Sequence, residues 1–60
     1  MPYVNVKTAG KLTKEQKSII AEKFTAVLFE VAGKKPESTY IVFDQVERED
    51  WASGGKLLSE

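Results

Sequence analysis

The sequence predicts a single α+β domain over residues 1–60: a β-α-β unit with parallel strands, followed by a C-terminal hairpin and completed by oligomerisation. Three segments in order support this fold class. The first alternates apolar and polar residues, the second has helical periodicity, and the third is dense in β-branched and aromatic residues. Two strands joined by a helix are expected to run parallel, through a right-handed crossover.

The first strand is predicted at Tyr3–Lys7, where Val4 and Val6 share one face and the intervening residues share the other. Pro2 is compatible with this start, because the first position of a strand can lack a ladder donor. Residues 8–12 contain a glycine and are expected to form a loop.

The helix is predicted to run from Lys14 to Ala32. Thr13 and Gln16 have the spacing of a capping box at its start, and Gly33 fits a C-cap. Pro36 prevents the helix from continuing. Apolar residues recur at spacings of three and four along one stripe of this helix: Ile20, Phe24, Val27, Leu28 and Val31.

The second strand is predicted at Thr39–Phe43, which shows no polar alternation and therefore favours burial of both faces. A charged turn at 47–50, a glycine-containing hairpin signal at Trp51–Gly55 and a short closing strand at 56–58 complete the chain. One helix covers only one face of a two-stranded sheet, so the other face needs further copies of the chain.

Composition also favours a homo-oligomer. The chain has no cysteine and no histidine, which excludes disulfides and the usual ligands of a structural zinc site. A domain of this size buries only about 60% of the surface that its unfolded chain exposes. Self-association is the remaining means of stabilisation.

Charge and hydropathy narrow the class of partner. Nine basic and nine acidic residues give a formal net charge of zero, so no nucleic-acid partner is expected. No apolar run is long enough for a membrane span, and no signal-peptide pattern is present. We therefore expect a cytoplasmic protein. Without histidine, cysteine or a glycine-rich phosphate loop, the sequence favours chemistry that uses no metal or organic cofactor.

Pro2 is the candidate catalytic residue. Removal of Met1 would leave a secondary amine at the chain end, and burial among apolar groups would lower the pKa of that amine. A neutral amine of this kind can act as a general base. The alternative is that Met-Pro is an ordinary start without a catalytic role. Acidic residues at 47, 49 and 50 are interpreted as a solvated turn rather than as an acid/base pair.

Several elements together resemble one known family. They are Pro2 with its strand, Gly10-Lys11, Glu15-Gln16-Lys17, the strand Tyr40–Phe43, and Trp51 before Gly54-Gly55. In this order and spacing, over nearly its whole length, the chain resembles the 4-oxalocrotonate tautomerase family. That resemblance implies small β-α-β protomers assembled as hexamers (trimers of dimers), with the amino-terminal proline as the base.

The resemblance also implies substrate-binding residues. Lys11 is similar to a family arginine that holds a substrate carboxylate, although ungapped counting back from the helix would place Leu12 at that position. A second family arginine reaches a neighbouring subunit's site, and here Tyr40 replaces it. Tyr40 offers a neutral hydrogen bond, which leaves open whether a dicarboxylate is accepted.

Trp51 occupies the family's aromatic position before the glycine pair. It would form an apolar wall near the base, and the alternative is that it fills a subunit interface. Arg48, the only arginine, could replace the missing cation or lie in a solvated turn.

The resemblance implies an isomerase (tautomerase) that moves a proton between the enol and keto forms of a small unsaturated or 2-oxo acid. Two alternatives remain at this point. One is hydratase or dehalogenase activity on an unsaturated acid, with the proline amine acting as an acid. The other is a non-catalytic oligomeric binding module that has kept the fold.

Overall fold

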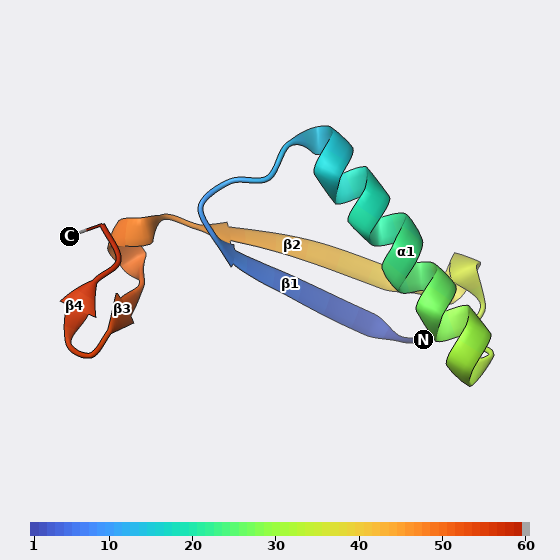
Figure 1. Cartoon of the computed structure of the whole chain (residues 1–60). Helices are drawn as coiled ribbons and strands as arrows, with labels where there is room; N and C mark the ends of the chain where they lie inside the picture. The colour runs from blue at the N-terminus through green and yellow to red at the C-terminus, as the bar shows by residue number, and fades with distance from the viewer. Residues whose placement is uncertain (60) are drawn as a thin grey trace.

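The computed structural model describes residues 1–59 and confirms the predicted fold class (Figure 1). Its elements are β1 (Tyr3–Ala9), α1 (Lys14–Ala32), β2 (Tyr40–Val46), β3 (Ala52–Ser53) and β4 (Lys56–Leu57), with short 3-10 turns at Pro36–Ser38 and Arg48–Asp50. β1 and β2 pair in parallel, and β3 and β4 form an antiparallel hairpin. The hairpin extends beyond the end of the main sheet (Figure 1).

The parallel sheet has one covered and one open face. α1 lies across one face, where Val4, Val6, Ile41 and Phe43 are half-buried. Residues of the opposite parity are exposed: Tyr3, Asn5, Lys7, Tyr40, Val42 and Asp44. The second strand was expected to be buried on both faces, and within one protomer only one of its faces is covered.

The helix begins and ends where the sequence predicts. The Thr13 hydroxyl accepts the Gln16 N–H at 3.1 Å, and the Gln16 side-chain oxygen accepts the Thr13 N–H at 2.9 Å. This capping box satisfies two backbone donors that have no partner within the helix. At the other end Gly33 has a φ of 65°, which permits its N–H to bond the Phe29 carbonyl at 3.0 Å.

Both strands differ from their predicted bounds. The first was expected to end at Lys7, but the ladder with β2 continues to the pair Ala9–Val46. Thr39 was expected in the second strand; instead it ends the 3-10 turn, and its N–H bonds the Pro36 carbonyl at 3.2 Å. Cross-strand pairing at the far end thus extends a segment whose local sequence favours a loop.

The apolar stripe of α1 is wider than the area that the protomer's own sheet covers. Ile20 and Leu28 are half-buried, whereas Val27 is 53% exposed and Val31 is 83% exposed. Within one protomer, only part of the predicted stripe is therefore covered. Phe24, another residue of the stripe, is 42% exposed, and Phe29, which lies outside the stripe, is 55% exposed.

The protomer has almost no interior. None of residues 1–59 is fully buried, and their shape is extended, with principal extents of 42 × 23 × 15 Å. The radius of gyration is 14.4 Å, whereas a compact domain of this length would have one of about 10 Å. The protomer by itself therefore buries no core, which is consistent with the predicted self-association.

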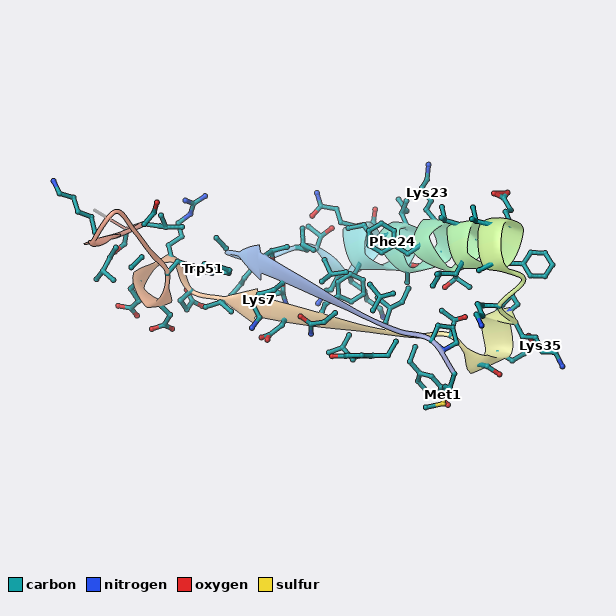
Figure 2. All side chains as sticks on the ribbon, turned by 90° about the horizontal axis from the view of Figure 1, so that it is seen from below. Met1, Lys7, Lys23, Phe24, Lys35 and Trp51 are labelled. Atoms are coloured by element: carbon teal, nitrogen blue, oxygen red, sulfur yellow. The ribbon has the colours of Figure 1, made fainter. Side chains whose placement is uncertain are left out.

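We predict that Val42→Asp disrupts self-association, because it places a charge in the middle of the open sheet face. Sedimentation velocity should show the wild type as an oligomer and the variant shifted to smaller species, with reduced helical signal. Lys23→Asp is the control, since Lys23 points away from the sheet (Figure 2). Unchanged assembly of Val42→Asp would contradict a role for this face.

Candidate functional site

Pro2 lies at the start of β1, on the end of the sheet where β2 also begins. It is half-buried, and its carbonyl accepts the Tyr40 N–H at 3.0 Å. Tyr3 and Tyr40 are paired across the two strands, so their phenols share the open face beside Pro2. The backbone ladder therefore brings Tyr40 of the same chain next to the candidate base.

Met1 controls the chemistry available to Pro2. The Met1 side chain is exposed, and the residue is 89% accessible at the sheet end. While the Met1–Pro2 peptide bond is intact, the Pro2 nitrogen is a tertiary amide and carries no basic lone pair. Removal of the exposed methionine would convert it to a secondary amine at the same place.

Lys11 and Trp51 lie at the opposite end of the sheet. Figure 2 shows Trp51 and Met1 near opposite ends of the β1–β2 sheet. Lys11 follows Gly10, whose N–H bonds the Val46 carbonyl at 2.8 Å at the end of β2. A seven-residue strand spans about 20 Å, so one protomer does not bring Lys11 or Trp51 to its own Pro2.

The loop before α1 distinguishes Lys11 from Leu12. Lys11 is exposed, whereas Leu12 is half-buried and its N–H donates to the Gln45 side-chain oxygen at 2.6 Å. The segment therefore presents its cation to solvent from Lys11 and its apolar side chain inward from Leu12. Gln45 was not identified from the sequence. The sequence did hold one indication: counting every second residue from Ile41 and Phe43 places the polar Gln45 on the same face of the strand.

Trp51 connects the second 3-10 turn to the hairpin. It is half-buried, and its carbonyl accepts the Leu58 N–H at 3.0 Å. Its indole Nε1 is shielded from solvent and has no hydrogen-bond partner within the described part of the chain. Trp51 is therefore held at the base of the hairpin by its backbone, while its indole N–H makes no hydrogen bond within the described residues. Arg48 is exposed in the adjoining charged turn.

Other charged and hollow features lie apart from these residues. Lys7 and Asp44 form an ion pair of 3.4 Å on the open sheet face, with both side chains about half exposed. An open groove of about 530 Å³ lies beside α1. Its lining consists of Ala21, Glu22, Thr25, Ala26, Phe29 and Pro36. This groove contains none of the predicted site residues.

The described residues, 1–59, contain neither a metal-binding cluster nor a membrane-spanning helix. No group of three His, Cys, Asp or Glu side chains in that range could hold a metal ion. The helix it contains is too polar to cross a bilayer.

Comparison with known proteins establishes the family. Residues 2–60 match the family described as "Tautomerase enzyme", so the match begins at Pro2. The chain belongs to the tautomerase family. This confirms the resemblance drawn from the sequence and identifies the chain as an enzyme with isomerase activity of the tautomerase type.

Two named tautomerase relatives align over nearly their whole length. A probable tautomerase of Bacillus cereus is 40% identical over 60 residues, covering 100% of this chain and 98% of the relative. The 2-hydroxymuconate tautomerase of Bacillus subtilis is 35% identical, with coverage of 100% and 97%. The similarity to these two relatives thus extends over nearly the full length of both aligned chains.

A solved tautomerase structure confirms the architecture. The crystal structure of YwhB, a homologue of 4-oxalocrotonate tautomerase, superposes with a TM-score of 0.90 at 34% identity. The alignment covers 98% of this chain and 97% of that chain. The β-α-β unit and the C-terminal hairpin are therefore features of the tautomerase fold.

Proposed function

We propose that this tautomerase interconverts the enol and keto forms of a small unsaturated or 2-oxo acid, with Pro2 as general base. The observation that carries the proposal is the position of Pro2. It opens β1, is half-buried and is bonded through its carbonyl to Tyr40. A prolyl amine at this point would be partly shielded from water, which favours its neutral, basic form.

The proposed reaction is a proton relay on one nitrogen. The neutral Pro2 amine takes the enol hydroxyl proton, which leaves a conjugated enolate and a prolyl ammonium. The ammonium then returns the proton to a carbon of the same conjugated system, giving the ketone and the neutral amine. Donors near the enolate oxygen lower the barrier, because negative charge develops there.

Self-association supplies the residues that one protomer keeps apart. We propose that Lys11 and Trp51 of a second copy pack against the Pro2 end of the first, in a homo-oligomer that we expect to be a hexamer. The open sheet face, the exposed Val31 and the projecting hairpin support such packing. Trp51 would then serve both the interface and the pocket wall.

Tyr40 is proposed to bind a substrate oxygen through its phenol. The ladder brings Tyr40 of the same chain to the Pro2 end. A contribution from Tyr40 of a neighbouring subunit, expected from the resemblance, stays a prediction. A hydrogen bond to a charged group contributes about 1.5–3 kcal/mol and a neutral one about 1 kcal/mol. With Lys11 as the main cation, we propose that monocarboxylates are favoured over dicarboxylates.

We expect Pro2→Ala to lower kcat/KM for ketonisation of phenylenolpyruvate, a monoacid enol, by about 100-fold or more, because general base catalysis typically contributes a factor of that size. Loss of Met1 from both proteins is verified by mass spectrometry, and sedimentation verifies assembly. Lys23→Ala is the activity control. Full activity of Pro2→Ala would overturn the assignment.

The pH profile separates the proposed reaction from its closest alternative. With Pro2 as base, kcat/KM rises with pH as the amine loses its proton and then levels off. In a hydratase or dehalogenase with a protonated Pro2 as acid, the same titration lowers the rate. A falling profile in stopped-flow assays would favour that alternative, and no rate with any enol acid would favour a non-catalytic module.

We further predict that Lys11→Ala raises KM for phenylenolpyruvate about tenfold, the equivalent of about 1.4 kcal/mol, while kcat changes little. The physical reason is loss of the ammonium that pairs with the substrate carboxylate. Steady-state kinetics on the assembled variant test this. An unchanged KM would remove Lys11 from the site and favour its interpretation as a solvated loop lysine.

A further inference from the structure

We propose that Gln45 is a positioning residue that holds the Lys11 loop in its substrate-binding conformation. The inference rests on the proposed function, since it assigns Lys11 to the substrate carboxylate. Gln45 would not touch the substrate. It would act through the backbone of Leu12, the residue that follows Lys11.

Two long-range hydrogen bonds anchor the backbone on both sides of Lys11. The Gly10 N–H donates to the Val46 carbonyl at 2.8 Å, and the Leu12 N–H donates to the Gln45 side-chain oxygen at 2.6 Å. The second bond joins residues 33 positions apart in sequence. Lys11 is therefore the one exposed residue between two points tied to the end of β2.

The position of Gln45 indicates why this contact persists. Gln45 is paired with Thr8 in the ladder and is half-buried on the face that α1 covers. A polar side chain on a largely apolar face costs free energy unless it is hydrogen-bonded. The Leu12 N–H provides that bond, so the strand and the loop stabilise each other's conformation.

Gly10 determines the direction in which the loop leaves β1. Its φ is +94°, a conformation that other residues rarely adopt, and its carbonyl accepts the Thr8 hydroxyl at 3.1 Å. With this turn before Lys11 and the Gln45 contact after it, few backbone conformations remain for Lys11. An ordered backbone reduces the entropy that the lysine loses when it binds a carboxylate.

The chain contains a matched comparison on the same loop. Its two glutamines each accept one backbone N–H of this segment: Gln45 that of Leu12, and Gln16 that of Thr13. The Gln16 contact belongs to the helix cap and lies on the exposed side. Replacing each by methionine, which has similar length and no comparable acceptor, removes one loop contact at a time.

The test is steady-state kinetics with phenylenolpyruvate on assembled Gln45→Met and Gln16→Met, each also combined with Lys11→Ala. We expect Gln45→Met to raise KM about fivefold with kcat within twofold, and Gln16→Met to leave KM within twofold. In the Lys11→Ala background, Gln45→Met should change KM no further, because the contact between Lys11 and the substrate carboxylate is already lost.

Three results would overturn the inference: an unchanged KM in Gln45→Met, an equal rise in Gln16→Met, or the same rise with and without Lys11. If Gln45→Met does not assemble, Gln45→Ala, which also lacks the acceptor, is subject to the same criteria. Loss of activity in Pro2→Ala is measured alongside. If Pro2→Ala loses activity, the proposed function is supported even where the Gln45 inference fails.

Discussion

The structure depends on one parallel pairing, between β1 and β2, with a single helix to cover it. The crossover through α1 gives the two strands seven paired positions and half-buries Val4, Val6, Ile41 and Phe43. It leaves the other sheet face without cover. Because a two-stranded sheet is unstable by itself, we expect self-association to cover this open face.

The same pairing determines how the site is divided. Parallel strands put both amino-terminal ends together, so Pro2 and Tyr40 share one end of the sheet. Lys11 and Trp51 follow the strands and share the other end: Gly10, the residue before Lys11, bonds Val46 at the end of β2. A pocket that uses both groups needs copies arranged end to end or side by side. Assembly and catalysis would then require the same interfaces.

The absence of histidine and cysteine limits the chemical groups that this tautomerase can use. A prolyl amine is suited to that limit, because its basicity depends on removal of one residue and on partial burial of the strand end. The charged side chains of the open face, Lys7 and Asp44, lie further along the ladder from Pro2. Lys7 pairs with Asp44 at 3.4 Å, two ladder positions beyond Asn5 and Val42.

Local sequence by itself determined α1, its caps, the parallel order of the strands and the candidate base. The Thr13–Gln16 box and the Gly33 cap depend on contacts within a few residues. The resemblance to tautomerases added Lys11, Tyr40 and Trp51. Their proposed contacts with substrate stay predictions, because they involve more than one copy.

Tertiary structure alone decided three things. Ladder pairing extended β1 to Ala9, since a partner strand provides hydrogen bonds that the loop-like sequence does not indicate. The covered area of α1 excluded Val31 from the packed stripe, because periodicity gives a direction and not the width of a contact. The Gln45–Leu12 bond joins residues 33 apart. No local pattern encodes such a contact, which exists only once the loop folds back onto the end of β2.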